Sequence, residues 1–214
     1  MGGLDRGIIV GADVSSRHAG FVLIDGRTGK SLAFRHMLAN SSDPVEVSCY
    51  FVEGLIQLAR DVLLDDDLKS FDWDVIVEKP LLQFSGTRWR QRDIIRLVEV
   101  NAAFRALVRE RFVTNAIPLA ANTARSVFKL NSGNQGVKDR VVGFAHEKLN
   151  LIHGWMSLPR RAKEDIADAY VLSYAWFIRE SKKRSAIYSS THEVKTNFPK
   201  SIVIQHRRQS FHTL

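Results

Sequence analysis

Residues 7–25, GIIVGADVSSRHAGFVLID, decide the fold, because they form an apolar run, a short polar turn and a second apolar run. The β-branched residues 8–10 suit a strand that is buried on both faces, and residues 15–18 suit a turn into a neighbouring strand. Asp13 is the unusual residue. A carboxylate at the end of a buried strand costs solvation free energy unless a metal ion, a cation or several donors compensate it. The simpler interpretation is that Asp13 caps the turn through nearby backbone amides.

The later strands and helices follow from the same patterns. Residues 31–38 alternate well enough for a third strand, so the first three strands predict an antiparallel meander. Residues 73–78, WDVIVE, predict a fourth buried strand that also ends in a carboxylate, Glu78, before Pro80 stops it. A fifth strand is expected within residues 112–119, and Asn122 is expected to cap a short helix. The expected helices are residues 44–64, 87–112, 124–128, 137–149 and 163–181.

The charge of the chain favours a polyanionic partner. Lys and Arg number 31 against 23 Asp and Glu, which gives a net charge of +8 and a pI near 9.8. Such an excess is typical of proteins that bind nucleic acid rather than acidic small molecules. The excess is uneven, because residues 181–214 hold seven cations and one acid, Glu193. We therefore expect a folded domain at residues 1–180 and a basic, flexible tail at residues 181–214.

An intracellular, soluble protein is expected from the composition. The apolar content of 45% is that of a globular chain. The lone cysteine, Cys49, excludes a disulfide framework and a cysteine-built zinc site and fits a reducing compartment. No apolar run approaches the roughly 18 residues of a membrane span, and the opening residues, MGGLDRG, lack the apolar segment of a signal peptide. The expected location is the cytoplasm or nucleoid, for a cellular or a viral source alike.

Two aspartates in the segment KEDIADAYVLS form a second carboxylate pattern. Asp165 and Asp168 are three residues apart, so on a helix they project from the same face about one turn apart. A competing interpretation is that they are surface residues in the first turn of a helix, where negative charge is favourable. The small residues Ala167 and Ala169 and the apolar run that follows favour a face packed near the core. Buried acids in such a place need cations.

These acidic residues can meet in one fold. If the first and fourth strands are neighbours in a mixed sheet, Asp13 and Glu78 lie side by side, and the last helix places Asp165 and Asp168 over them. Four carboxylates in one small volume suit two hard divalent ions about 3.5–4 Å apart. One ion would activate a water molecule, and the other would stabilise the leaving 3′-oxygen. This is chemistry for phosphodiester hydrolysis.

The three acidic segments, GADVSSRHAGFVLID, DVIVEKP and KEDIADAYVLS, occur in an order that resembles the RuvC type of Holliday junction resolvase, in the ribonuclease H-like superfamily. The resemblance covers residues 8–175, roughly four fifths of the chain. It implies an α/β fold with a mixed five-stranded sheet, whose first three strands are antiparallel, flanked by helices. It also implies a nuclease domain at residues 1–180. The matching catalytic and metal-binding positions are Asp13, Glu78, Asp165 and Asp168.

The resemblance also implies an activity and a partner. Family members are homodimers that bind a four-way DNA junction and nick two opposing strands symmetrically, using two Mg²⁺ or Mn²⁺ ions per active site. The expected activity is therefore that of a crossover junction endodeoxyribonuclease, with a role in DNA recombination and repair. No membrane partner is expected.

Basic residues near the acidic segments are candidates for DNA contacts. The stretch GVKDRV at residues 136–141 resembles the family's segment with a functional lysine at the start of the penultimate helix, which makes Lys138 the first candidate. A solvated lysine on a helix is the competing interpretation. Further basic residues are candidates for phosphate contacts on the expected helices or beside them: Lys148, Lys163, Arg88 and Arg92.

An aromatic residue is also expected at the junction. Bacterial family members place one three positions after the strand glutamate, where it can wedge into the junction centre. This chain has Leu81 at that position, so junction handling is expected to differ. Phe84 and Trp89 are the candidates to replace it, and core packing is the competing interpretation for both.

Several alternatives share some of these features. Actin-like kinases have the same strand-turn-strand opening but need a second comparable domain and glycine-rich nucleotide loops, and transposases with the same acid order usually carry an additional catalytic domain. A RuvC-like nuclease acting on other branched DNA or on RNA remains open. So does a non-catalytic basic nucleic-acid-binding domain whose acids are structural, which predicts salt-dependent binding without metal-dependent cleavage.

Overall fold

The computed structural model describes residues 7–63, 68–80, 91–132 and 136–195. The chain divides into two compact units, one that ends at residue 179 and one that begins at residue 180. The last helix passes through this boundary. The sheet, its covering helices and the acidic residues all belong to the first unit, which the following paragraphs describe.

The first unit is built on a five-stranded mixed sheet. Its strand order is β3-β2-β1-β4-β5. Strands β1, β2 and β3 are antiparallel neighbours, whereas β4 pairs parallel with β1 and β5 pairs parallel with β4. The predicted mixed sheet with three antiparallel strands is therefore confirmed. The strands are β1 Gly7–Val14, β2 His18–Asp25, β3 Ser31–Leu38, β4 Asp72–Glu78 and β5 Ile117–Leu119.

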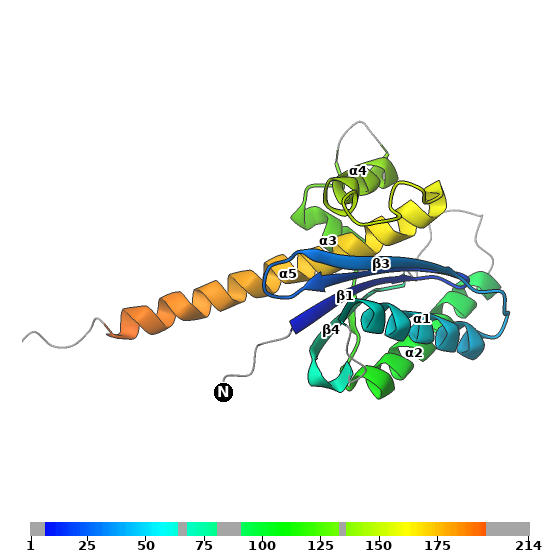
Figure 1. Ribbon diagram of the computed structural model, residues 1–214, viewed down its shortest axis with the longest axis horizontal. Helices are drawn as coiled ribbons and strands as arrows, with labels where there is room; N and C mark the ends of the chain where they lie inside the picture. The colour runs from blue at the N-terminus through cyan, green and yellow to red at the C-terminus, as the bar shows by residue number, and fades with distance from the viewer. Residues whose placement is uncertain (1–6, 64–67, 81–90, 133–135, 196–214) are drawn as a thin grey trace, which may run out of the picture. The chain divides into compact units, whose positions relative to one another are not determined.

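Helices cover both faces of the sheet (Figure 1). Helices α1 and α2 pack on one face, and α3, α4 and the first half of α5 pack on the other. The Asp43 carboxylate accepts hydrogen bonds from the backbone N–H groups of Val45 and Glu46, at 2.8 and 2.9 Å, so it caps α1 where the sequence predicts a helix start. The helices are α1 Pro44–Leu63, α2 Gln91–Phe112, α3 Ala121–Val127, α4 Val137–Leu149 and α5 Arg160–Lys195, and the 3₁₀ turn η1 Leu68–Ser70 precedes β4.

Three predicted boundaries differ from the structure. The fifth strand is only three residues long, because α2 continues to Phe112 and Val113 then takes a positive φ of 55°. Helix α3 begins before Asn122, with Ala120 at the cap position and no side-chain cap, so the predicted Asn122 cap is wrong. Helix α5 continues to Lys195 rather than ending at residue 181, because no Gly or Pro interrupts residues 160–195.

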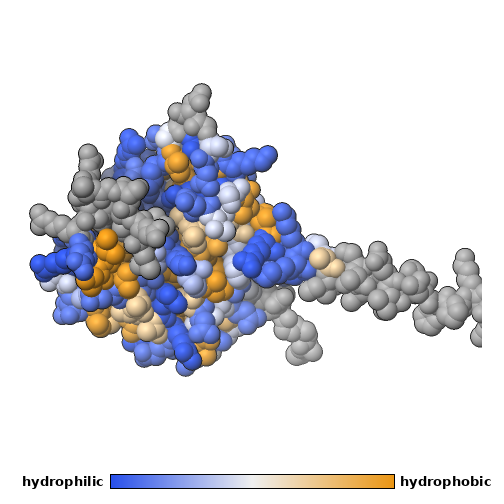
Figure 2. Space-filling view, turned by 180° about the vertical axis from the view of Figure 1, so that it is seen from behind, coloured by the Kyte–Doolittle hydropathy of each residue, from blue (hydrophilic) through white to orange (hydrophobic). Residues whose placement is uncertain are grey.

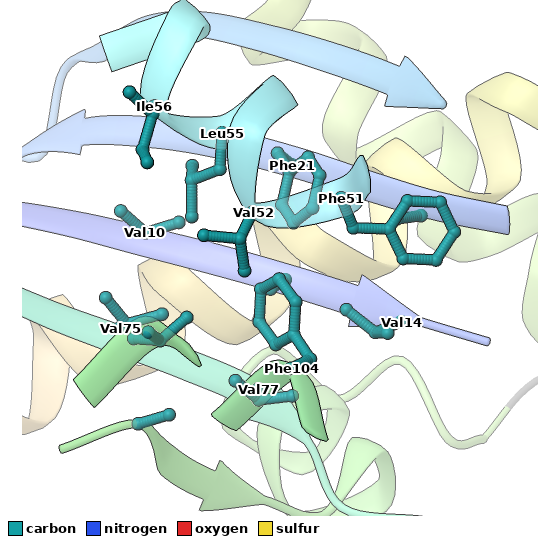
Figure 3. Packing of buried hydrophobic residues seen from close by; sticks show 14 of the residues in the cluster. Val10, Val14, Phe21, Phe51, Val52, Leu55, Ile56, Val75, Val77 and Phe104 are labelled. Carbon is teal, nitrogen blue, oxygen red and sulfur yellow. The ribbon is translucent and has the colours of Figure 1, made fainter. Parts of the chain in front are cut away.

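The strands separate two hydrophobic cores. Alternate residues such as Val10, Phe21 and Val75 pack against Phe51 of α1 and Phe104 of α2, as Figure 3 shows. The residues between them point to the opposite face, because successive side chains of a strand alternate. There Ile9, Val22 and Ile76 contact the second core, which α4 and α5 complete.

Helix α5 lies unusually close to the sheet at two glycines. A Cβ atom on Gly11 would overlap the carbonyl oxygen of Ala169, and one on Gly20 would overlap the backbone of Asp165 and lie 2.7 Å from the Ile166 nitrogen. Only glycine lets the helix backbone approach a strand this closely. The approach places the acidic turn of α5 directly over the ends of β1 and β2.

The exposed surface is mixed in character. Hydrophobic residues lie among hydrophilic ones on the face that Figure 2 shows. Among the described helices, none carries an apolar stretch long enough to cross a membrane. Within the described ranges, the exposed large hydrophobic residues are Leu38, Val45, Tyr50, Ile95, Val98, Val113, Val127, Leu151 and Met156.

The close approach of α5 predicts a large effect of a single methyl group. We expect Gly20→Ala to lower the free energy of unfolding by about 1–3 kcal/mol or more, because the new Cβ must push the Asp165 turn away from the sheet. Gly143→Ala is the matched control, since Gly143 is an exposed residue of α4 with nothing within 4 Å of an added Cβ. That change should raise the free energy of unfolding by about 0.5–1 kcal/mol. Urea denaturation measures both, and equal effects would contradict the tight approach.

Candidate active site

Two strand ends bring the first pair of carboxylates together. The parallel pairing of β1 with β4 sets Ala12 opposite Val77, so the next residues, Asp13 and Glu78, lie side by side at the carboxyl ends of their strands. Ala12 and Val77 belong to the core under α1 and α2. Asp13 and Glu78 therefore point to the opposite face, under α5. The first and fourth strands are neighbours, which is the condition on which the predicted meeting of these two acids depends.

Helix α5 brings the second pair of carboxylates to the same face. Asp165 and Asp168 are both buried, with side chains only 3% exposed. Their charges act on Asp13 together with that of Glu78. The four predicted acids thus form one electrostatically coupled group, although they come from β1, β4 and α5.

Burial, together with neighbouring like charges, changes the titration of Asp13. Burial raises its pKa well above the ordinary value of 3.8, and the charge of Glu78, a hydrogen bond with Glu78 and the charges of Asp168 and Asp165 raise it further. Repulsion of this kind is relieved by a bound cation or a shared proton. The arrangement is therefore suited to holding positive charge near Asp13.

Two cations hold the Asp168 carboxylate. Its Oδ1 atom accepts a hydrogen bond from Arg125 Nη2 at 2.7 Å, and its Oδ2 atom accepts a short one from Lys138 Nζ. Burial lowers the pKa of Lys138, but the charge of Asp168 and this hydrogen bond outweigh burial, so the pKa is raised overall. Lys138 is therefore a cation, and both basic groups compensate the buried aspartate.

Asp165 has different partners. Its Oδ2 atom lies 3.1 Å from His36 Nε2 and 4.0 Å from His18 Nδ1, and its Oδ1 atom lies 3.2 Å from Arg161 Nε. Burial lowers the pKa of His18, and the charges of Arg161, His36 and Arg17 lower it further against the attraction of Asp165. Asp165 thus sits between a histidine pair and an arginine.

A cavity of about 300 Å³ opens where these groups meet. Three of the four acids line it, whereas Asp165 is not among the described lining residues. Three cations share its wall, so positive and negative groups face the same space. The charged lining residues are Asp13, Glu78, Asp168, Arg125, Lys138 and Arg161.

The remaining predicted contact residues lie elsewhere. Lys148 is exposed in the last turn of α4, and Lys163 Nζ donates to the Met156 carbonyl at 3.1 Å. Arg92 is exposed at the start of α2, where it lines a separate hollow of about 430 Å³ with Arg96. None of the three is a described lining residue of the carboxylate cavity. Leu81, Phe84, Arg88 and Trp89 lie outside the described residues.

The sequence interpretation missed four groups at this site. Arg125 and Arg161 reach the acids from α3 and α5, and His18 and His36 reach Asp165 from the sheet. The sequence holds a partial signal for His36, because alternation along a strand predicts which side chains of β3 lie on the same face of the sheet. The contacts themselves depend on tertiary packing.

The donor set decides which metal fits the cavity. Asp13, Glu78 and Asp168 offer carboxylate oxygens, which hard divalent ions such as Mg²⁺ and Mn²⁺ prefer. Burial, followed by the charges of Glu78 and Asp168, raises the pKa of Asp13, so positive charge in the cavity would stabilise the ionised carboxylates. The residues therefore fit hard divalent ions, and the cations beside them fit the oxygens of a phosphate.

Comparison with known proteins identifies the fold. No protein-family model matches the chain, and a search of curated proteins gives no match. Among solved structures, the chain is similar to RuvC of Thermus thermophilus, with a TM-score of 0.54 and 13% identity over 82% of this chain and 96% of that one. It is also similar to T. thermophilus RuvC in complex with Holliday junction substrate, with a TM-score of 0.53 and 12% identity over 81% of this chain and 95% of that one. The predicted RuvC-type fold is confirmed.

The raised pKa of Asp13 predicts a pH-dependent gain of stability for Asp13→Asn. The folded chain binds the Asp13 proton more tightly than the unfolded chain, so this contribution is present below the ordinary pKa of 3.8 and is lost as the pH rises through the raised value. At neutral pH without divalent ions, Asp13→Asn should therefore raise the free energy of unfolding by something on the order of 1 kcal/mol. The gain should vanish in acid, as urea denaturation across a pH series would measure.

Asp25→Asn is the control of opposite sign. Burial alone would raise the pKa of Asp25, but hydrogen bonds from Thr28 and Arg27 outweigh burial and lower it. Its contribution is present above the ordinary pKa and is lost as the pH falls through the lowered value. Asp25→Asn should then destabilise the chain at neutral pH. A constant effect of Asp13→Asn at every pH would contradict the repulsion.

Proposed function

We propose that this chain is a structure-selective endodeoxyribonuclease that cuts branched DNA, with four-way junctions as its preferred substrate. The single observation that supports this is the convergence of Asp13, Glu78 and Asp168 with Arg125 and Lys138 in one cavity on a RuvC-type fold. A hydrolase acting on phosphodiesters needs acidic groups for divalent ions and basic groups for phosphate. The cavity holds both.

The proposed catalytic group is Asp13, Glu78, Asp165 and Asp168, with two Mg²⁺ or Mn²⁺ ions as the cofactor. Such ions activate a water molecule as nucleophile and stabilise the leaving 3′-oxygen. The protein's part is to hold the carboxylates rigidly, with Asp13 and Glu78 fixed by the strand pairing and Asp168 by α5. Asp165 contributes charge to the group but does not line the cavity, so its place as a ligand is the least direct.

Arg125 and Lys138 are the proposed phosphate-binding residues. Both reach the same Asp168 carboxylate, so a phosphate oxygen that approaches Asp168 meets a guanidinium and an ammonium group at once. The Arg125 Nε atom is buried and has no hydrogen-bond partner among the residues that the structure describes, so within this part of the chain the guanidinium keeps one donor unused. These two residues would orient the scissile phosphate and stabilise its charge.

The proposed assembly is a homodimer. A four-way junction must be cut on two opposing strands, and the proposed catalytic acids of one chain converge at a single place. Two copies related by a twofold axis would supply two cavities for two symmetric cuts. The positive charge of the chain supports a polyanionic substrate, whereas the proposed branch rests on the likeness to T. thermophilus RuvC in complex with Holliday junction substrate.

Replacing single carboxylates by amides tests the nuclease. We expect Glu78→Gln and Asp168→Asn to reduce Mg²⁺-dependent cleavage of a labelled four-way junction by more than roughly 100-fold, since even outer-shell partners of a metal are worth 10–100-fold. Junction binding without Mg²⁺ should persist. Asp165→Asn is expected to behave in the same way, and cleavage that survives this change would remove Asp165 from the catalytic group.

Asp61→Asn is the matched control for these variants. Asp61 is an exposed carboxylate of α1 that pairs with Arg35, so its loss should leave cleavage unchanged. The substrate class is tested in parallel with linear duplex, flap and RNA/DNA hybrid. Binding of the junction without any metal-dependent cutting by the wild-type chain would instead favour a non-catalytic nucleic-acid-binding domain.

Arg125→Gln tests the phosphate role separately. Each phosphate contact adds about 0.9 to the slope of log binding constant against log salt concentration, so the slope for junction binding should fall by about that amount. Arg105→Gln is the control, because Arg105 is exposed on α2, the helix on the other face of the sheet. An unchanged slope for Arg125→Gln, or an equal loss in both variants, would exclude Arg125 as a specific contact.

A further inference from the structure

A second cluster of metal-binding atoms lies beside the carboxylate cavity. It consists of His18 at the start of β2, His36 on β3 and Asp165 on α5. One imidazole nitrogen from each histidine and one carboxylate oxygen all lie within 4.8 Å of one another. Among the described residues, no other group of three or more His, Cys, Asp and Glu side chains brings its ligand atoms this close together.

The sheet and the helix hold these three residues in place. In the register between β2 and β3, His36 lies opposite Gly20, and Gly20 has no side chain to fill the space between β3 and α5. The backbone of Asp165 packs directly on that glycine. The Asp165 side chain therefore contacts His36 above Gly20. His18, two residues before Gly20 on β2, approaches the same carboxylate.

The described residues leave one nitrogen of the cluster without a hydrogen bond. His18 Nδ1 is buried and has no hydrogen-bond partner among the described residues, and it lies 4.0 Å from the Asp165 carboxylate. A buried polar nitrogen without a partner is costly, and a native structure that keeps one requires an explanation. A bound ion that accepts the nitrogen lone pair supplies that explanation.

The geometry suits a small ion with tetrahedral coordination. Ligand bonds of about 2.0–2.1 Å, as at zinc, place neighbouring ligand atoms roughly 3.3 Å apart. The separation from Asp165 Oδ2 is 3.1 Å for His36 Nε2 and 4.0 Å for His18 Nδ1, so small side-chain rotations would complete the shell. Arg161 donates to the other oxygen of Asp165, which orients the carboxylate as outer-shell donors commonly do.

We propose that His18, His36 and Asp165 bind one transition-metal ion of the zinc class, at a site that shares Asp165 with the proposed catalytic group but whose two histidines lie outside the oxygen-lined cavity. Two imidazoles and one carboxylate are a ligand set for such ions, whereas Mg²⁺ prefers oxygen alone. Three protein ligands leave a fourth position for water. The site accounts for the orientation of Asp165, whose carboxylate faces the histidines. It does not depend on nuclease activity.

The test is direct metal binding by the untagged full chain. Zn²⁺ is titrated calorimetrically after chelation and dialysis, and Co²⁺ is titrated as a visible probe whose absorption reports coordination by imidazole. We expect one high-affinity ion per wild-type chain. His36→Gln and His18→Gln should each weaken binding by at least roughly 100-fold, because outer-shell partners alone are worth 10–100-fold.

Two further variants separate this site from its surroundings. His153→Gln removes an exposed histidine and should leave the affinity for Zn²⁺ unchanged. Glu78→Gln removes a ligand of the carboxylate cavity and should also leave it unchanged. Far-ultraviolet circular dichroism and the unfolding midpoint without metal establish that each variant is folded.

The outcomes decide the proposal independently of the nuclease. Loss of Zn²⁺ binding in the folded His18 and His36 variants, with retention in His153→Gln and Glu78→Gln, supports the site even if no DNA is cut. Absence of a stoichiometric ion in the wild-type chain overturns it. Equal affinity in all variants, or loss in Glu78→Gln alone, also overturns it, because the ion then binds elsewhere.

Discussion

The close contact between α5 and the glycines of β1 and β2 is the constraint on which the rest of the structure depends. Gly11 and Gly20 leave no side chain between strand and helix, so the helix backbone itself rests on the sheet. This close contact holds Asp165 and Asp168 near enough to Asp13 for their charges to raise its pKa. A larger residue at either position would separate the acidic turn from the strand ends that complete it.

The acids so gathered are held by charge balance. Each buried aspartate of α5 has basic or imidazole partners, Arg125 and Lys138 for Asp168 and the histidine pair for Asp165. Breaking one such pair leaves a buried charge uncompensated, which is strongly destabilising. Burial and the neighbouring carboxylates still raise the pKa of Asp13, so ionising this residue remains unfavourable. Functional sites commonly retain such unfavourable interactions where a ligand is meant to relieve them.

The sequence predicts the helices and strands of this fold better than its side-chain contacts. The β3 and α4 bounds follow from residues 31–38 and 137–149, because alternation and helical period are strong there. The adjacency of Asp13 and Glu78 was predicted on the condition that the first and fourth strands are neighbours, and the parallel pairing of β1 with β4 meets that condition. Arg125 and His36 were not predictable, because a short helix and a strand register bring them to the acids. The end of α5 was missed because a helix without an apolar stripe shows no period.

The wide separation of the acidic residues along the chain has a consequence for biosynthesis. Asp13 leaves the ribosome early, whereas Asp168 follows about 150 residues later. The sheet and its first covering helices can assemble in the meantime, but the acidic cluster stays incomplete until α5 has emerged and docked on Gly11 and Gly20. Under the proposed function, the site for divalent ions is therefore complete only after translation has delivered α5, the last helix of the described chain.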